Sequence, residues 1–166
     1  LNDGGFVISW TSFGQGSSVG LIYAQRYDVN GGTNGSEFQV SNAHSYQQYY
    51  SSTTSLSDGG FIVTWRKEFN TDDFADIYAQ IYDTSGARVG AEFRVNDYTY
   101  GGQTNHSIAA LNDGGFVVTW EDADSYGSGI FAKVSNSDGN TVGEEFQVNT
   151  YFKYSQNKPY ITALND

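Results

Sequence analysis

The side chains best suited to binding chemistry are tryptophans and glutamines that recur along the chain. The three tryptophans are separated by 55 residues each time, and the glutamines lie eight residues before a leucine. An indole ring stacks on the apolar face of a sugar, and an amide both donates and accepts hydrogen bonds. These residue types predict repeated shallow glycan sites at Trp10, Trp65, Trp120, Gln48, Gln103 and Gln156. The competing interpretation, which we favour, places the tryptophans in the core and uses the glutamines to satisfy backbone groups.

Carboxylates gather after the third tryptophan. Glu121, Asp122 and Asp124 precede Gly127, an arrangement similar to part of a calcium loop. Calcium takes about six to eight oxygen ligands, and this segment supplies a partial set. The equivalent segment 11–20 of the first unit holds no carboxylate, so the pattern does not predict a calcium site in every unit. A solvated acidic loop is the competing interpretation, and we expect no obligatory cofactor.

The loops that follow the tryptophans differ most between the units. They cover residues 11–20, 66–76 and 121–129, and the second holds three aspartates, Asp72, Asp73 and Asp76. Variable loops on a repeated scaffold are where binding specificity usually resides. If the protein binds glycans, we expect the binding to occur near these loops.

The chain shows no catalytic constellation. Hydrolysis of a glycoside needs a placed acid and a nucleophile, and no pair of residues stands out for these roles. His44 and His106 have no second ligand at a metal-binding spacing. The arginines are too scattered to form a cluster for a carboxylate substrate: Arg26, Arg66, Arg88 and Arg94. We therefore expect a protein that is not an enzyme.

Composition narrows the classes of partner. The chain has 166 residues, a net charge of −11 and no cysteine, so disulfides and thiolate zinc sites are excluded. A strongly acidic surface repels phosphate backbones and anionic lipid surfaces. No apolar run approaches the roughly 18 residues of a membrane-spanning helix. Nucleic acid and membrane insertion are thus not expected.

The sequence consists of three repeated units. LNDGGFVISW, LSDGGFIVTW and LNDGGFVVTW are followed by LIYAQRYD, DIYAQIYD and GIFAKVSN, and then by EFQVS, EFRVN and EFQVN. A further apolar run precedes each Asp-Gly-Gly where the chain allows it, as in HSIAAL and YITAL. The chain is therefore one repeat domain, with units at about 1–49, 50–104 and 105–158 and a closing strand at 159–166.

Each unit predicts four short strands. The runs are rich in Val, Ile, Tyr, Phe and Thr, and Asp, Asn and Gly separate them, as is typical of strands joined by tight turns. Residues 116–120 carry large side chains on both faces, and a sheet that is apolar on both faces must lie between others. Small four-stranded sheets stacked face to face, one per repeat, are the blades of a β-propeller. A β-trefoil or β-prism, which also has three units of four strands, is the alternative.

The pattern DGGFVVTW, IYAQ-x-YD and EF-x-VN resembles the tandem repeat of large acidic bacterial surface or secreted proteins. It is also similar to the Asp-box blade of sialidase-like propellers, where a strand ending near a tryptophan follows an Asp-Gly turn. The resemblance spans nearly the whole chain. It implies propeller-type blades and an extracellular or cell-surface location, and a fragment of a glycoside hydrolase propeller is one function that it leaves open.

The first unit lacks its first strand, and the last residues supply one. In closed propellers such a terminal strand completes the first blade and removes an unpaired edge. We expect residues 159–164 to pair with residues 5–10 of the same chain or of a neighbouring copy. Propellers use about four to eight blades, so two copies in a six-bladed ring, a longer array or a filament are the expected assemblies. The contact would involve Phe6, Ile8, Tyr160, Ile161, Ala163 and Leu164.

These observations predict a non-enzymatic extracellular repeat module that associates with itself by β-strand completion, as in a surface layer, fibre or adhesin. A glycan-binding lectin is the alternative from another class. Asn34 and Asn105 fit the pattern for N-glycosylation, which matters only in a glycosylating organism.

Overall fold

The computed structural model describes residues 1, 3–43, 45–69, 74–124, 127–151 and 153–164, with Asp124 described by its backbone alone. The described residues form 11 strands and no helix, so none of them belongs to a helix that would cross a bilayer. Every strand pairs antiparallel with its neighbours. The predicted all-β class is confirmed.

Each sequence unit folds into one sheet. The three sheets have the strand orders β1-β2-β3, β4-β5-β6-β7 and β11-β10-β9-β8, and we number them sheets 1, 2 and 3. Sheet 1 holds β1 (Phe6–Ser12), β2 (Leu21–Tyr27) and β3 (Phe38–Gln39); sheet 2 holds β4 (Gln48–Ser55), β5 (Phe61–Glu68), β6 (Ala75–Tyr82) and β7 (Arg88–Arg94); sheet 3 holds β8 (Thr104–Ala110), β9 (Phe116–Asp124), β10 (Gly127–Ser135) and β11 (Phe146–Gln147).

The Asp-Gly-Gly turns connect the strands as their residue types predict. The second glycine donates its N–H to the aspartate side chain, at 2.8 Å between Gly60 and Asp58 and at 3.0 Å between Gly115 and Asp113. The first glycine has a positive φ, 91° at Gly59, which residues with a side chain rarely adopt. These turns join β4 to β5 and β8 to β9.

A second repeated turn follows β2, β6 and β10. The side chain at its first position accepts two backbone N–H groups, as at Asp83, which accepts from Ser85 and Ala87, both at 2.9 Å. The hydrogen bond from the Ser85 hydroxyl is the largest cause that lowers the pKa of Asp83, and these backbone bonds add to it. Asp28 and Asn136 make the same pair of backbone bonds in sheets 1 and 3.

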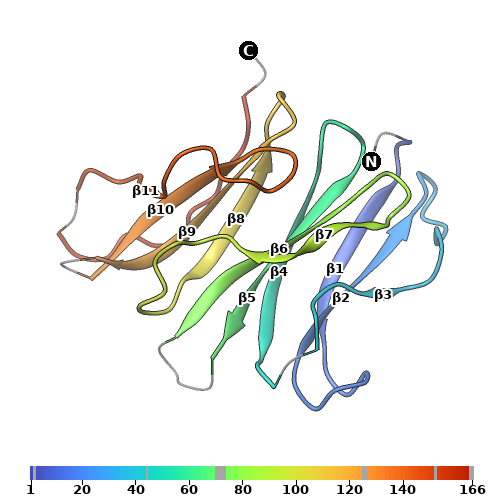
Figure 1. Ribbon diagram of the computed structural model, residues 1–166, viewed down its shortest axis with the longest axis horizontal. Helices are drawn as coiled ribbons and strands as arrows, with labels where there is room; N and C mark the ends of the chain where they lie inside the picture. The colour runs from blue at the N-terminus through green and yellow to red at the C-terminus, as the bar shows by residue number, and fades with distance from the viewer. Residues whose placement is uncertain (2, 44, 70–73, 125–126, 152, 165–166) are drawn as a thin grey trace.

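The sheets stack face to face in sequence order, fanning out from sheet 3 to sheet 1 (Figure 1). One core cluster lies between sheets 1 and 2 and includes Ile22, Ala24, Val63 and Trp65. The other lies between sheets 2 and 3 and includes Ile77, Ala79, Phe116, Val118 and Trp120. Sheet 2 is therefore apolar on both faces because it is covered on both, as its sequence predicts.

The three sheets do not close on themselves. Within the described residues β1 pairs with β2 alone, and residues 157–164 belong to no strand. The predicted pairing of residues 159–164 with residues 5–10 is thus not formed inside one chain. The outer strands β3 and β11 are also short, two residues each.

Candidate functional site

The repeated tryptophans occupy two different environments. Trp65 and Trp120 have no exposed surface, and the Trp65 ring stacks on Tyr78 with its centroid 6.3 Å away. Each of these tryptophans lies in line with the Phe and Val side chains of its own strand. This row of side chains packs against the preceding sheet. Trp10 holds the same position in β1, which no other sheet of the described residues precedes, and it is only half-buried. Of the three rings, Trp10 alone therefore has surface open to a ligand.

The repeated glutamines bind backbone groups. Gln48 donates from Nε2 to the Asn42 carbonyl at 3.1 Å, and Gln103 donates to the Tyr100 carbonyl at 3.5 Å. Gln156 donates to the Tyr154 carbonyl at 2.8 Å. Gln48 and Gln103 therefore brace the segments that lead from one sheet to the first strand of the next, and Gln156 makes the equivalent bond in the last segment. Their use in glycan recognition stays a prediction.

An asparagine works together with each glutamine in the second and third units. The Oδ1 atom of Asn96 accepts the Ile77 N–H at 2.8 Å, and its Nδ2 donates to Asp76 at 2.8 Å and to Gln103 at 3.3 Å. Asn149 repeats this arrangement, donating to Gln156 at 2.9 Å. The signal for this role in the sequence is the polar residue that closes each EF-x-V phrase.

The acidic segment after Trp120 does not gather its carboxylates. Glu121 and Asp122 are adjacent residues of β9, so their side chains point to opposite faces of sheet 3. Glu121 accepts from Asn105 Nδ2 at 2.8 Å and from the Lys158 N–H. Burial raises the pKa of Asp122, and hydrogen bonds from Gln103 and the Ala123 N–H partly offset that rise.

No group of three His, Asp or Glu side chains in the described part of the chain is arranged to hold a metal ion. The Asp124 side chain and the residues His44, Asp72 and Asp73 lie outside the described part. Asp76 is described and is buried, with Arg94 at 3.7 Å and Asn96 as its neighbours. Burial raises the pKa of Asp76.

The two glycosylation triplets have different exposures. Asn34 is exposed in the turn after β2, where its N–H donates to the Arg26 carbonyl at 2.9 Å. Asn105 lies within β8, and its amide is engaged by Glu121.

The residues predicted for self-association lie at two exposed places. Phe6 and Ile8 of β1 are 43% and 47% exposed, and Tyr160 and Leu164 in the last segment are 90% and 75% exposed. Ile161 and Ala163 are half-buried, so the segment 159–164 alternates between more and less exposed side chains. This alternation is the pattern of a strand that lies against a surface on one face.

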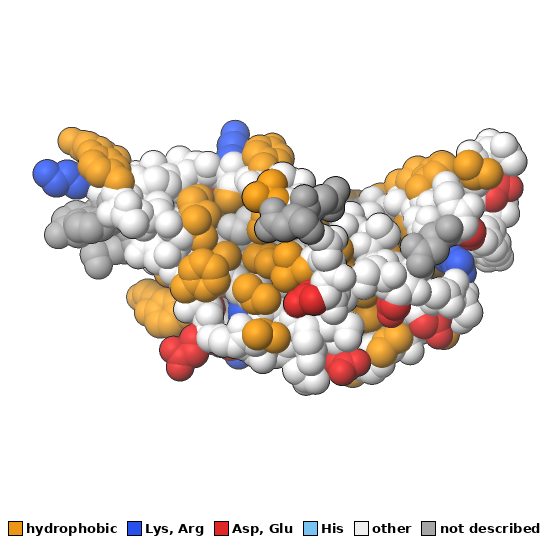
Figure 2. All heavy atoms as spheres, turned by 90° about the horizontal axis from the view of Figure 1, so that it is seen from above, with side chains coloured by type: hydrophobic (Ala, Val, Ile, Leu, Met, Phe, Trp, Pro, Cys, Tyr) orange, Lys and Arg blue, Asp and Glu red, His pale blue; other side chains and the backbone are white. Residues whose placement is uncertain are grey.

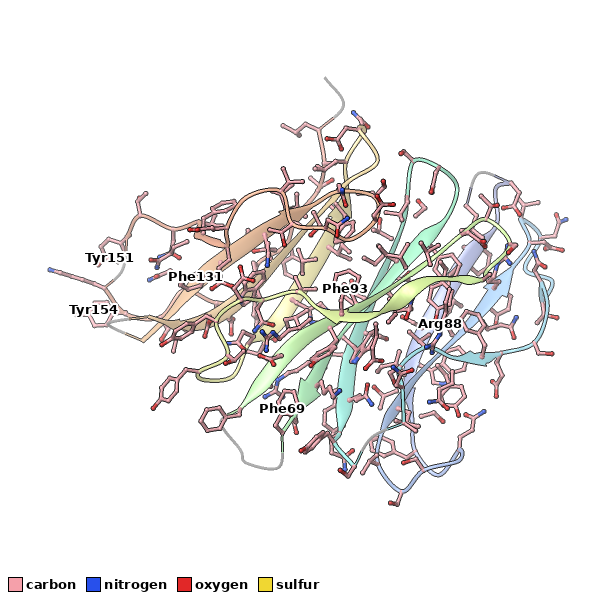
Figure 3. All side chains as sticks on the ribbon, in the orientation of Figure 1. Phe69, Arg88, Phe93, Phe131, Tyr151 and Tyr154 are labelled. Carbon is pink, nitrogen blue, oxygen red and sulfur yellow. The ribbon has the colours of Figure 1, made fainter. Side chains whose placement is uncertain are left out.

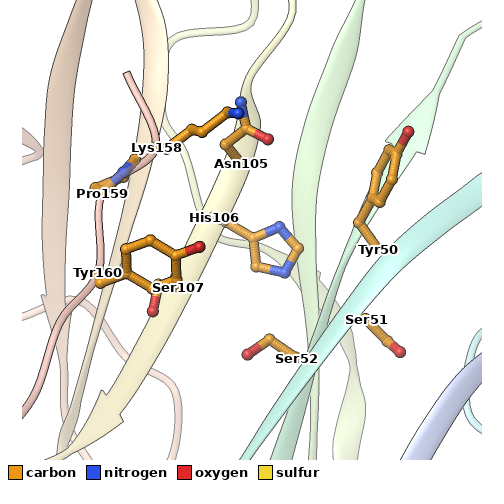
Figure 4. Close-up of a pocket in the computed structure, with 9 residues that line it drawn as sticks. All are labelled: Tyr50, Ser51, Ser52, Asn105, His106, Ser107, Lys158, Pro159 and Tyr160. Carbon is orange, nitrogen blue, oxygen red and sulfur yellow. The ribbon is translucent and has the colours of Figure 1, made fainter. Parts of the chain in front are cut away.

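Hollows occur among the described residues at the junctions of these elements. One of about 470 Å³ lies among the beginnings of β4, β8 and the last segment (Figure 4). A second, about 400 Å³, is lined by Phe69, Phe74, Asp76, Tyr78, Arg94 and Thr99. The third, about 170 Å³, lies between β1 and β4.

No protein-family model matches this chain, and no curated protein matches it.

Proposed function

We propose that this protein is a non-enzymatic structural module of an extracellular or cell-surface assembly, and that copies associate head to tail by completing one another's sheets. The observation that carries the proposal is that sheets 1 and 3 each expose large apolar side chains, such as Phe6 and Val148, at positions whose equivalents Phe61 and Val95 are buried inside the stack. The stack of one sheet per repeat favours propeller-type blades over a trefoil.

The two internal interfaces show what each end face fits. At both, the Phe, Val and Trp of one sheet pack on the Ile, Ala and Val of the sheet before it. Phe61, Val63 and Trp65 meet Ile22, Ala24 and Val40 in this way. The same contact is therefore made twice within one chain.

One half of this contact is exposed on sheet 1. We define the head face as Phe6, Ile8 and Trp10, which match Phe61, Val63 and Trp65 in the repeat. Phe6 is 43% exposed, whereas Phe61 is 1% exposed. The turn beside the head face is open as well: a side chain added at Gly31 would meet nothing within 4 Å, while the equivalent Gly86 lies against Arg26.

The other half is exposed on sheet 3. We define the tail face as Ile130, Val134, Phe146 and Val148, which follow the alternation of β10 and β11, with the small buried Ala132 between them. Val148 is 51% exposed, whereas its equivalents Val40 and Val95 are 0% and 3% exposed. Seen from above, hydrophobic side chains are exposed at both ends of the molecule (Figure 2). Burying such apolar surface is favourable by about 25 cal/mol per Å².

Polar contacts repeat at the internal interfaces too. Glu92 accepts the Asn42 N–H and Glu145 accepts the Asp97 N–H, both at 2.7 Å. Arg88 also reaches from β7 to the Val40 carbonyl beside β3 (Figure 3). The remaining glutamate of the series, Glu37, lies on the head side and accepts from Gln15 Nε2 within the chain, and the matching N–H of Thr150 is on the tail side. We expect these two groups to bond between copies.

The last segment shares two features with the segments that begin β4 and β8, the first strands of sheets 2 and 3. The Gln156 N–H donates to the Ser128 carbonyl at 2.8 Å, as the Gln103 N–H donates to the Ala75 carbonyl at 3.0 Å. Lys158 has a φ of 55°, close to the 50° of the equivalent Asn105. We expect the last segment of another copy to pair with the free edge of β1. This edge lies beside the hollow of about 170 Å³ that Phe6 and Thr53 line.

Two copies would supply six sheets, three from each, and about four to eight blades close a propeller. A head-to-tail contact whose rotation does not close gives a filament instead. Light scattering over a concentration series separates these outcomes, since a ring stops at two copies and a filament grows.

Paired variants make the test specific. Ile8→Asp on the head face and Val148→Asp on the tail face should each give monomers, because each places a charge in an apolar contact. A mixture of the two variants keeps one intact interface and should form a heterodimer that grows no further. Tyr98→Asp, at an exposed residue outside both faces, is the control and should associate as the wild type does. A wild-type protein that stays monomeric at every concentration contradicts the proposal.

Glycan binding is a second candidate, favoured by the 400 Å³ hollow beside the loop after Trp65. Aromatic rings of Phe74 and Tyr78 line it together with the Asp76–Arg94 pair, which joins stacking surfaces to hydrogen-bonding groups. A glycan array tests this candidate, with Arg94→Ala as the variant expected to lose any signal.

A further inference from the structure

We propose that the hollow at the beginnings of β4, β8 and the last segment binds a neutral, hydroxyl-rich ligand, and that this ligand is a sugar residue. This inference does not require self-association, although Pro159 and Tyr160 of the last segment line the hollow, and it concerns a different place from the hollow beside the loop after Trp65. Its lining residues come from three segments that are equivalent in the repeat, and the volume of about 470 Å³ suits a small molecule.

The backbone at this place is held in an uncommon conformation. Tyr50, Asn105 and Lys158, one from each segment, have φ values of 55°, 50° and 55°. A left-handed conformation costs about 1 kcal/mol or more for a residue with a side chain, and such positions cluster at ligand sites. In β4 and β8 the pairing register shifts here, between Tyr49 and Ser52 and between Thr104 and Ser107. Ser52 and Ser107, the first paired residues after each shift, line the hollow.

His106 carries the chemistry of the site. Its ring lies between the Ser52 side and the Lys158 side of the hollow (Figure 4). Both ring nitrogens are shielded from solvent, and neither makes a hydrogen bond of ordinary geometry within the described residues. Burial lowers the pKa of His106 to about 4, and a weaker contact with the Thr64 carbonyl offsets this only in part. The ring is therefore neutral at pH 7 and carries one donor and one acceptor, which a ligand reaches when the side chains that shield the nitrogens move aside.

The other lining groups favour hydroxyls over ions. Ser51, Ser52 and Ser107 each supply a hydroxyl group that donates and accepts. The lining contains one ionised side chain, Lys158, and no carboxylate, so it lacks the ligands that a divalent cation needs. The nearby Glu121 carboxylate is engaged by Asn105 and by the Lys158 N–H. These lining groups both donate and accept hydrogen bonds, and an alcohol group on a ligand does the same.

Aromatic rings flank the polar centre. Tyr50 is 68% exposed and Tyr160 is 90% exposed, and they stand on opposite sides of His106 in Figure 4. An exposed ring beside hydroxyl-binding groups is the usual way in which a protein covers the apolar face of a sugar. The site thus combines a polar floor with stacking surfaces at its rim.

The test follows the imidazole signals of His106 by NMR while D-glucose, D-galactose and N-acetylglucosamine are added in turn. At least one of these sugars should shift the His106 signals in a saturable manner. Ser107→Ala should weaken its binding about fivefold, the effect of one neutral hydrogen bond. Lys158→Ala, at an exposed side chain, should weaken it as well without disturbing the core. The His106→Gln variant identifies the signals, since the only other histidine is His44.

Controls separate this site from the alternatives. Arg94→Ala, in the hollow beside the loop after Trp65, should leave the His106 shifts unchanged. The proposal is overturned if no sugar moves the His106 signals, if sugars move only the signals of Tyr78 and its neighbours, or if sulfate and acetate bind here while the sugars do not. The last result would identify an anion site built on Lys158.

Discussion

Val95 and Val148 occupy the same position in successive repeats, yet Val95 is 3% exposed and Val148 is 51% exposed. The difference arises because sheet 3 covers Val95, while no sheet of the described residues covers Val148. Since equivalent residues pack in the same way wherever a neighbour exists, the covered position indicates which surface would fit the open one. At the covered position that surface is the Phe-x-Val-x-Trp row of β9, and β1 carries the similar row Phe6, Ile8 and Trp10.

The first prediction concerns the register of the proposed contact between copies. In sheets 2 and 3, Thr53 pairs with Val63 and Ile108 pairs with Val118. The equivalent pair between copies is Ile161 with Ile8. The chain has no cysteine, so a mixture of Ile8→Cys and Ile161→Cys proteins can form only introduced disulfides. We expect a covalent heterodimer under mild oxidation, because opposite residues of paired strands meet the distance for a disulfide.

The control for this cross-link is Val7→Cys, whose side chain points to the other face of β1. Mixed with Ile161→Cys, it should cross-link far more slowly. Equal rates for the two mixtures would mean that the segments collide without pairing in this register.

The second prediction concerns the asparagine that joins sheet 2 to β8. Asn96→Ala removes the acceptor of the Ile77 N–H and a donor to the buried Asp76, so it should lower the free energy of unfolding by about 2–3 kcal/mol. Asn149→Ala removes equivalent bonds at a half-buried site and should cost less. Urea unfolding measures both. Equal costs would show that burial does not set the strength of this network.

The sequence was sufficient to predict the all-β class and most turns, because these depend on local signals. Asp83 and Gly59 specify their turns through groups close by in the chain. The internal faces also followed from alternation, since Val118 and Trp120 fall on one side of β9. These are properties of a strand and its immediate neighbours.

Other features depend on contacts that a repeat pattern does not encode. Trp10 and Trp65 are the same residue in the same phrase, and only the presence of a preceding sheet makes Trp65 fully buried. The separation of Glu121 from Asp122 follows from the length of β9, which extends past Trp120 where the sequence suggested a loop. In the sequence His106 is a histidine without a second metal ligand. Its position beside β4 and the last segment depends on how neighbouring sheets pack, which the sequence pattern does not specify.

The third prediction concerns pH. In the unfolded chain the imidazole of His106 titrates at about 6.5, whereas burial lowers its pKa to about 4 in the folded protein. The unfolded chain thus binds this proton more readily. The contribution of His106 to stability is complete above about pH 6.5 and is lost as the pH falls through about 4, by at most about 3 kcal/mol.

The carboxyl groups of Asp76 and Asp122 act in the opposite direction. Their pKa values are raised by burial, so the folded state holds their protons more readily and their contribution falls as the pH rises through those raised values. The comparison of wild type with His106→Gln isolates the histidine. Denaturant unfolding at pH 7 and pH 4.5 should show a smaller loss in the variant, and identical losses would mean that the imidazole is hydrated in the folded protein.

The fourth prediction concerns the tryptophans. Trp65→Ala should lower the free energy of unfolding by about 3–5 kcal/mol, because it empties a fully buried site between sheets 1 and 2. Trp10→Ala in dilute protein should cost less than about 2 kcal/mol, since part of that ring is exposed. At higher protein concentration Trp10→Ala should also weaken association between copies, because Trp10 belongs to the head face. If Trp10→Ala alters neither the dilute stability nor the mass measured by light scattering, the head face is not the surface through which copies meet.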